Sequence, residues 1–306
     1  MPELPEVETI RRQLDKELKG YAISAVQTDF TKSFRPSFET VNRVIVGGVI
    51  KAFDRQAKLL ILRLLLPVKE SPRQVYLIFH LKLTGQLLVR KPKDPADKYV
   101  RSVFTLVAPP GKLRESNRSK IPDLNSSDPR SNGLGSMELR FADARKFGYV
   151  KLITDKKEMG DLLKSYGPEP FKDLKLKNFT QILKSSARPI KTILLDQEKI
   201  SGIGNIYAND ALWLAGLDPR RASHKVTKSQ AGRLYKAILV VLKRGLKYGG
   251  ASDQWYVQAH GEKGKYQEHF LVYGKNGEKC QRCGAEIKRI VVGGRGTFYC
   301  PACQSL

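Results

Sequence analysis

Cysteine, acidic residues and long apolar runs are all scarce in this chain of 306 residues. Its four cysteines all lie between Cys280 and Cys303, so no disulfide framework can extend over the chain. This distribution favours reduced thiols and a cytoplasmic rather than a secreted protein. No apolar run approaches the roughly 20 residues of a membrane span. The first helix is charged throughout, unlike a signal peptide. We therefore expect no membrane partner.

The shortage of acidic residues leaves a large excess of positive charge. Lysine and arginine total 55 against 30 aspartates and glutamates, which gives a net charge of +25 and a pI near 9.9. A charge of this size indicates a polyanionic partner, of which nucleic acid is the first candidate. A ribosome-like or membrane-surface role is the alternative. The length is sufficient for two domains and a sizeable core.

The first residues combine an amine with a carboxylate. If Met1 is removed, Pro2 becomes the N-terminus, and its α-amine titrates near ~8. A neutral amine can attack an electrophilic sugar carbon, and the neighbouring Glu3 can donate or accept a proton. A frayed terminus is the alternative. However, apolar residues recur at helical spacing and predict a helix from about Pro5 that docks this terminus on a core: Leu4, Val7, Ile10, Leu14 and Leu18.

Short β-type runs between turns follow the first helix and predict an antiparallel sandwich or barrel. They are Ala22–Val26, Val44–Phe53, Lys58–Leu66, Val75–Leu81, Gly85–Val89, Val100–Val107, Met137–Phe141 and Tyr149–Ile153. Beyond the turn-rich segment 166–170 the pattern is helical. The expected helices are Phe179–Ser185, Lys191–Leu195, a helix that follows the glycine-rich turn before Asn205, and Lys228–Lys247 with a capping box of Thr227 and Gln230.

The cysteines form two Cys-x-x-Cys pairs separated by 16 residues. Four thiolates at this spacing, Cys280, Cys283, Cys300 and Cys303, predict one tetrahedral Zn²⁺ site. A redox-active pair is the alternative. Between the pairs, Ile287–Val292 and Thr297–Tyr299 predict a hairpin whose glycine-rich turn carries Arg295 at its tip.

The opening Met-Pro-Glu-Leu-Pro-Glu-Val-Glu-Thr-Ile-Arg-Arg resembles that of formamidopyrimidine-DNA glycosylases, which excise oxidised purines. The resemblance extends over nearly the whole chain. It implies an α+β multidomain fold with an N-terminal helix plus β-sandwich domain (1–165), a linker (166–178), a helix–two-turn–helix domain (179–268) and a zinc finger (269–306). The partner implied is damaged double-stranded DNA, bound by a monomer at the bacterial nucleoid.

The same resemblance implies a bifunctional glycosylase and abasic-site lyase of the Fpg/Nei family. In such an enzyme Pro2 attacks C1′ of a flipped nucleotide, and β- and δ-elimination cut the strand. The implied catalytic residues are Pro2, Glu3, Lys58 and Arg295. The implied DNA-binding residues are Glu6, His80, Leu83, Tyr99, Arg145, Phe147 and Asn205.

Several segments depart from the family pattern. Leu83 stands where a methionine is usual, and the segment 251–255 differs from the usual lesion-sensing loop. The polar stretch Pro109–Ser136 replaces a tight turn and predicts a long loop or insert. Two other functions remain open: an endonuclease VIII-like enzyme that prefers oxidised pyrimidines, and a non-catalytic zinc-ribbon DNA-binding protein.

Overall fold

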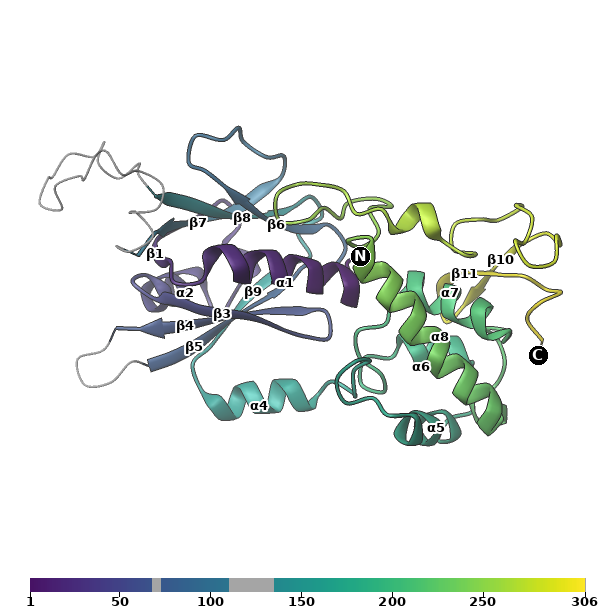
Figure 1. Ribbon diagram of the computed structural model, residues 1–306. Coiled ribbons are helices and arrows are strands. Elements are labelled where there is room, and N and C mark those ends of the chain that lie inside the picture. Colours follow the sequence, from purple (N-terminus) through teal and green to yellow (C-terminus); the bar gives the residue numbers. More distant parts are fainter. Residues whose placement is uncertain (68–72, 110–134, 306) are drawn as a thin grey trace, which may run out of the picture.

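The computed structural model describes residues 1–67, 73–109 and 135–305. Most of the predicted insert at 109–136 lies outside these residues. Figure 1 shows two halves side by side, with the strands β1–β9 and α1 (Leu4–Leu18) in one half and most of the other helices, together with β10 and β11, in the other.

The N-terminal half is a nine-stranded sheet in the order β2-β9-β5-β4-β3-β1-β7-β8-β6. The strands are β1 (Ala22–Thr28), β2 (Phe34–Arg35), β3 (Val49–Gln56), β4 (Leu59–Leu66), β5 (Arg73–His80), β6 (Gly85–Arg90), β7 (Val100–Val107), β8 (Ser136–Asp143) and β9 (Tyr149–Ile153). All neighbours are antiparallel except β2 and β9, which pair in parallel.

The sheet folds into a sandwich at the joint between β1 and β3, where the strand ladder has the single registered pair Ala22 and Val49. The two sections on either side of this weak joint share one core, into which α1 inserts Val7, Ile10 and Leu14. The predicted antiparallel sandwich is confirmed, apart from the parallel β2–β9 pair. The predicted strand Val44–Phe53 was wrong at its start. Its first two residues, Val44 and Ile45, end the helix α2 (Phe38–Ile45), and the strand begins at Val49.

The C-terminal half is helical and has a core of its own. Its helices are α5 (Leu176–Lys184), α6 (Ile190–Leu195), α7 (Asn205–Ala215) and α8 (Lys228–Lys247). The helix α4 (Lys156–Lys164) instead packs on β9, and its Met159 belongs to a small apolar cluster on the sheet. Short 3₁₀ turns occur at Thr31–Ser33, Ser223–Lys225 and Tyr266–His269. The hairpin of β10 (Lys288–Val292) and β11 (Arg295–Tyr299) follows. Within the described ranges, no helix is both long enough and apolar enough to span a bilayer.

Helix α8 begins where its sequence predicts. The Thr227 hydroxyl accepts from the Gln230 N–H, and the Gln230 side chain accepts from the Thr227 N–H, which completes the predicted capping box. By contrast, α2 and α4 were not predicted from sequence. Each is eight or nine residues long and is capped by a single residue, Ser37 or Asp155. Such short helices owe most of their stability to packing rather than to their own residues.

The start of α1 joins the two halves. Leu4 belongs to the core of the helical half, whereas Val7 belongs to the core of the sheet. The Leu4 N–H donates to the Gly202 carbonyl at 3.0 Å, in the turn that precedes α7. The N-terminal residues are therefore held at the junction of the two halves.

Candidate active site and metal centre

A pocket of about 180 Å³ opens where the N-terminal segment meets the start of α7. Five of the predicted site residues line it, although they come from distant parts of the sequence: Glu3, Lys58, Leu83, Asn205 and Arg295. Met1 also lines the pocket and is 42% exposed, whereas Pro2 behind it is buried. Loss of Met1 would therefore open the pocket toward the Pro2 nitrogen.

Glu3 is 2% exposed and caps the N-terminus of α7. Its Oε1 accepts from the Ile206 N–H at 2.9 Å, whereas its Oε2 is buried without a hydrogen-bond partner. Gly204 permits this approach, because a Cβ atom there would overlap the Glu3 carboxyl group. Burial raises the pKa of Glu3 to about 7, although the positive charge of Lys58 opposes the shift. Near neutral pH the carboxyl can thus both hold and release a proton.

Lys58 lies in the two-residue turn between β3 and β4, in which Ala57 adopts a left-handed φ of 55°. Its ammonium is buried and donates to the Ile203 carbonyl at 2.8 Å. Burial lowers the pKa of Lys58 to about 8, against the opposing effect of Glu3. A buried carboxyl and a buried amine that both titrate near neutrality are typical of a catalytic centre.

Glu6 lies deeper than the sequence analysis expected. Its carboxylate is 1% exposed and accepts from the Tyr207 hydroxyl at 2.7 Å and from the N–H groups of Ala251 and Glu3. It links α1 to α7 and to the segment after α8. Its oxygens are engaged within the protein, and its predicted contact with DNA stays a prediction.

Asn205 and Arg295 meet at the hairpin. The predicted turn, which included Arg295 and Gly296, was too long by these two residues. Gly293 and Gly294 form the turn, with φ of 57° and 73°, and Arg295 is the first residue of β11, paired with Val292. The Asn205 side chain donates to the Gly296 carbonyl at 3.1 Å. This bond ties the exposed Arg295 to the first turn of α7.

Lys191 was missed by the sequence analysis as a residue of this region. It is fully buried in α6 and donates to the Gly296 carbonyl at 2.9 Å and to the Thr297 hydroxyl at 2.7 Å. Burial lowers its pKa to about 7. The only available signal was a lysine within an apolar run, which is also compatible with a solvated helix face.

His80 ends β5 outside the pocket. Its Nδ1 accepts from the Lys82 N–H at 3.0 Å. Burial, reinforced by the positive charge of Lys82, lowers the pKa of His80 to about 3. The ring is thus neutral at physiological pH and carries its proton on Nε2, which can donate to a phosphate oxygen.

Arg145 and Phe147 lie together on an exposed turn after β8. The Asp143 carboxylate holds this turn by accepting from the N–H groups of Gly148 at 2.7 Å and Arg145 at 3.2 Å, and from the Thr84 hydroxyl. Phe147 is 52% exposed, and the Arg145 guanidinium lies 4.8 Å from its ring centre. A rigid turn thus presents a cation and an apolar ring to solvent, as a duplex probe requires.

Tyr99 contacts a residue that lines the pocket. It is 48% exposed and contacts the ring of Trp255 edge-on at 5.7 Å. Trp255 and Tyr273 both line the pocket, and neither was among the predicted site residues. For Trp255, the available signal was its position in the segment where the family resemblance places the lesion-sensing loop.

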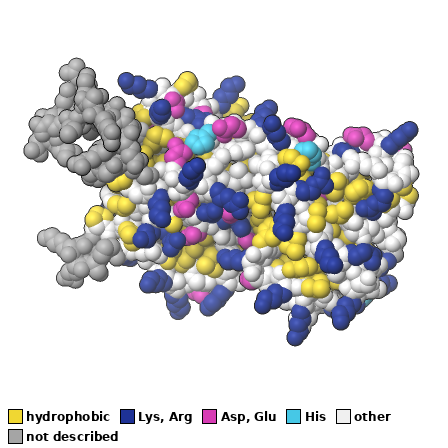
Figure 2. All heavy atoms as spheres, in the orientation of Figure 1, with side chains coloured by type: hydrophobic (Ala, Val, Ile, Leu, Met, Phe, Trp, Pro, Cys, Tyr) yellow, Lys and Arg dark blue, Asp and Glu magenta, His cyan; other side chains and the backbone are white. Residues whose placement is uncertain are grey.

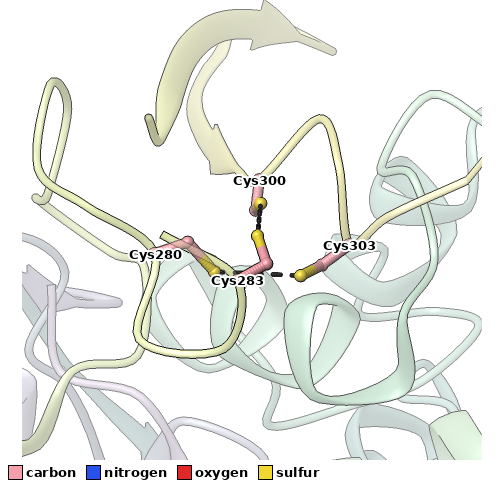
Figure 3. A group of neighbouring side chains, drawn as sticks. All are labelled: Cys280, Cys283, Cys300 and Cys303. Carbon is pink, nitrogen blue, oxygen red and sulfur yellow. Dashed lines mark hydrogen bonds between the residues drawn. The ribbon is translucent and has the colours of Figure 1, made fainter. Parts of the chain in front are cut away.

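The four cysteines converge from both ends of the hairpin, as Figure 3 shows. Their sulfurs all lie within 4.8 Å of one another, with Cys283 and Cys300 at 3.5 Å and Cys280 and Cys303 at 3.9 Å. Zn–S bonds of about 2.3 Å in a tetrahedron place sulfurs about 3.8 Å apart. The Trp213 indole N–H donates to the Cys280 sulfur at 3.4 Å, as an outer-shell group does. The arrangement fits one structural zinc ion, and all four thiols are free rather than paired.

Lysine and arginine side chains are spread over the face shown in Figure 2, and acidic side chains are fewer there. This distribution matches the net charge of +25. A basic surface, together with a pocket that contains a buried carboxyl, is suited to a polyanion.

Comparisons with known proteins agree with this arrangement. Three family models match: the formamidopyrimidine-DNA glycosylase N-terminal domain at residues 1–150, the H2TH domain of the same family at 166–256, and a zinc finger found in FPG and IleRS at 277–306. Among curated relatives, the formamidopyrimidine-DNA glycosylase of Herpetosiphon aurantiacus is 37% identical over 308 residues, with full coverage of both chains.

Solved structures extend the match to three dimensions. The complex between Lactococcus lactis Fpg and DNA containing an abasic site has a TM-score of 0.82 at 33% identity, with full coverage of both chains. A complex of the wild-type L. lactis protein with DNA containing an oxidised pyrimidine, also fully covered, gives 0.81 at 34% identity. Shared sequence over the full length, shared fold and the same terminal zinc finger lead to one conclusion: this chain belongs to the formamidopyrimidine-DNA glycosylase family.

Proposed function

We propose that this protein is a zinc-containing DNA glycosylase and abasic-site lyase that removes oxidised purines, such as 8-oxoguanine and formamidopyrimidines, from duplex DNA. One observation carries the proposal. The Glu3 carboxyl, with one oxygen fixed by the Ile206 N–H and the other unpartnered, faces the same pocket as Lys58 and lies directly beside Pro2.

The basic surface binds the DNA backbone and carries no sequence information. Because the glycosidic bond cannot be reached within the base stack, the damaged nucleotide must rotate out into the pocket. Phe147 and Arg145, exposed on their rigid turn, enter the duplex, and Leu83 at the pocket edge occupies part of the vacated space. Asn205, Arg295 and the Nε2–H of His80 hold phosphates on either side of the extruded nucleotide.

Excision begins when the neutral Pro2 nitrogen forms a bond to C1′. The glycosidic bond breaks, and the base leaves with the bonding electrons and a proton. Expulsion of the ring oxygen as a hydroxyl then gives an iminium ion and also requires a proton. The protonated Glu3 carboxyl donates to the departing base. The Glu3 carboxylate then takes the proton that the Pro2 nitrogen must lose before an iminium ion can form, and delivers it to the ring oxygen. A Glu3 pKa of about 7 allows both transfers near neutrality.

Strand cleavage follows from the iminium ion, which makes the 2′ proton acidic. Loss of that proton expels the 3′ phosphate, and a second elimination expels the 5′ phosphate. Lys58 and Arg295 stabilise the departing phosphates, and water finally releases the sugar fragment from Pro2. The zinc ion, held by the four cysteines, takes no part in these steps and maintains the hairpin that carries Arg295.

We also propose that the protein acts as a monomer on the bacterial nucleoid in the cytoplasm. The bacterial relatives and the basic surface support this proposal. A preference for oxidised pyrimidines is a second candidate, since a structural neighbour was solved with DNA containing an oxidised pyrimidine. The loop at 251–255, which lines the pocket in part, differs from the family pattern at the position where bases are distinguished.

A direct comparison of substrates tests the proposal. Duplexes with a single 8-oxoguanine, formamidopyrimidine or oxidised pyrimidine are incubated with excess enzyme, and the excision rates are compared. We expect faster excision of the purines. Borohydride trapping on abasic DNA is run in parallel. An adduct identifies an imine-forming enzyme, whereas DNA binding without any adduct would establish the non-catalytic alternative.

A further inference from the structure

The chain has two tryptophans, and they lie in opposite environments. Trp213 is 6% exposed and packs against the cysteine cluster, whereas Trp255 is 38% exposed and lines the pocket. A large exposed aromatic ring in a concave site is a feature of ligand binding rather than of folding. Trp255 has no role in the chemical steps described above.

The indole of Trp255 is held in place from the opposite half of the molecule. Tyr99 contacts it edge-on, with ring centres 5.7 Å apart and planes at 70°. The side-chain amide of Gln86, on β6, donates to the Trp255 carbonyl at 2.5 Å. The backbone of Tyr99 is held in turn, because its carbonyl accepts from the Asp143 N–H at 2.9 Å.

The loop that carries Trp255 is also fixed at both ends. The Ser252 N–H donates to the Gln267 side chain at 2.8 Å, and the Ser252 hydroxyl donates to the Tyr256 carbonyl at 2.7 Å. The Gly264 N–H donates to that hydroxyl at 2.8 Å. Only residues 253–255 are exposed between these anchors. The ring is therefore preorganised, and little conformational entropy is lost when a flat ligand packs on it.

On the basis of the proposed function, we propose that Trp255 is the stacking platform for the extruded base and that Tyr99 positions it. Stacking on an aromatic ring requires a planar π-system and is indifferent to the hydrogen-bonding pattern of the base. It therefore favours flat, aromatic lesions such as 8-oxoguanine over saturated, non-planar pyrimidine lesions. The aromatic residue thus contributes to the choice of lesion class, although Pro2 and Glu3 perform the same chemistry on both.

Abasic DNA separates this role from all others, because it has no base to stack. Single-turnover rates are measured for Trp255→Ala and Trp255→Phe on a duplex with 8-oxoguanine, on a duplex with dihydrouracil, and on a preformed abasic duplex. Trp255→Ala should slow 8-oxoguanine excision by about 5- to 100-fold. It should slow dihydrouracil excision less and change abasic cleavage by less than about twofold. Trp255→Phe should retain most of the 8-oxoguanine rate. Phe171→Ala, which truncates another exposed aromatic outside the pocket, is the matched control.

The positioning role of Tyr99 is tested with a double-mutant cycle. Tyr99→Ala should slow 8-oxoguanine excision by a smaller factor than Trp255→Ala, and the double variant should be no slower than Trp255→Ala alone. Additive losses would overturn the positioning role.

Two results would overturn the stacking role: unchanged 8-oxoguanine excision in Trp255→Ala, or an equal loss on the base-containing and abasic duplexes. If the wild-type protein cleaves abasic DNA but excises no oxidised base, the proposed glycosylase function fails instead, and the stacking role fails with it.

Discussion

Two buried groups of opposite charge type, Glu3 and Lys58, titrate near neutral pH in one pocket. The pKa of each group is shifted mainly by burial, which disfavours the charged form. The charge of each group opposes the pKa shift of the other. The hydrogen bond from the Ile206 N–H holds one Glu3 oxygen, and the Ile203 carbonyl holds the Lys58 ammonium. The site therefore changes its protonation state around pH 7 to 8, and both groups line the same pocket.

Glu3→Gln should separate excision from strand cleavage. Loss of the general acid should slow release of 8-oxoguanine by about 10²- to 10⁴-fold. An abasic site already equilibrates with an open aldehyde, so cleavage and borohydride trapping on preformed abasic DNA should remain measurable. Pro2→Gly keeps a terminal amine but moves it and makes it primary, so both activities should fall.

A protein with a blocked N-terminus, or with Met1 retained, is the control for the nucleophile. It should form no trapped adduct. Full trapping by the blocked protein would assign the nucleophile to a lysine, with Lys58 the first candidate, and would contradict the proline mechanism.

The pH dependence should follow the raised pKa of Glu3. The acid form that delivers a proton is present below about pH 7 and is lost as the pH rises through that value. The pH profile of the single-turnover excision rate should therefore have a limb that falls above pH 7. The profile for cleavage of abasic DNA should lack this limb. Lys58→Met removes a charge that lowers the pKa of Glu3, so any residual excision should have its limb at higher pH. A limb at the same pH in both proteins would exclude Glu3 as its origin.

The same pKa has a consequence for stability. The folded-state pKa of Glu3 lies above its ordinary value of 4.5. Below the ordinary value, the carboxyl is protonated in both the folded and the unfolded states, and its burial carries no ionic penalty. As the pH rises toward 7, the Glu3 carboxyl ionises in the unfolded state before it ionises in the folded state. Glu3 therefore lowers the stability of the fold progressively over this interval.

Phe147→Ala should weaken lesion processing without harming the fold. The ring is 52% exposed, so we expect the free energy of unfolding to change by no more than about 0.5 kcal/mol. Unstacking a base step costs a few kcal/mol, so excision from duplex DNA should slow by about tenfold or more when the wedge is lost. Cleavage of single-stranded abasic DNA serves as the control, because it needs no wedge. Unchanged duplex excision together with a lower melting temperature would identify Phe147 as a packing residue.

At the scale of elements, the N-terminus of α7 organises the site. Gly204 precedes this helix and leaves room for the Glu3 carboxyl, which occupies the position of an N-cap group and accepts from the Ile206 N–H. Asn205, the first residue of α7, holds the β10–β11 hairpin through the Gly296 carbonyl. One helix end therefore positions the Glu3 carboxyl, the proposed general acid, and, through the hairpin, Arg295.

Gly204→Ala tests this arrangement. Its φ of −129° suits any residue, so the only obstacle is the overlap of a new Cβ with Glu3. We expect most excision to be lost, together with about 1–3 kcal/mol of stability from overpacking. Gly232→Ala in α8 is the matched control, because nothing lies within 4 Å of a Cβ there. It should raise stability by up to about 1 kcal/mol and leave excision unchanged. Full excision by Gly204→Ala would show that Glu3 is not held against α7.

At the scale of the whole molecule, two cores are joined by a few strong contacts. Arg55 at the end of β3 forms a two-pronged ion pair with Glu169, at 2.5 and 2.7 Å, and a further one with Glu8 of α1. Leu4 enters the core of the helical half. The pocket lies at this junction, so its geometry depends on how the halves are held together rather than on either alone.

The zinc finger should behave as a separately removable part of this assembly. Purified protein should contain about one zinc per chain. A strong chelator should abolish DNA binding by unfolding the hairpin that carries Arg295. The sheet half, which has its own core, should keep its circular dichroism signal. Cys283→Ala should reproduce the effect of the chelator. Protein without metal but with an intact finger and normal DNA binding would contradict the assignment.

Local patterns in the sequence were sufficient for several features. The α1 periodicity and the α8 capping box involve residues a few positions apart, and the two Cys-x-x-Cys pairs are recognisable from their spacing. The antiparallel sandwich followed from the many short β-type runs. The family resemblance, rather than spacing, was the basis for grouping Pro2, Glu3, Lys58, Asn205 and Arg295.

Only the tertiary structure decided how these residues meet. Three of the contacts join residues that are far apart in the sequence. Glu3 caps α7, Lys58 donates to the Ile203 carbonyl, and Tyr99 packs against Trp255. Likewise, a glutamate in the first turn of a helix has the same sequence signal whether it faces DNA or, like Glu6, is buried in internal hydrogen bonds. Propensity and spacing describe the energy of a segment by itself, whereas burial and a shifted pKa depend on what other segments bring to the same place.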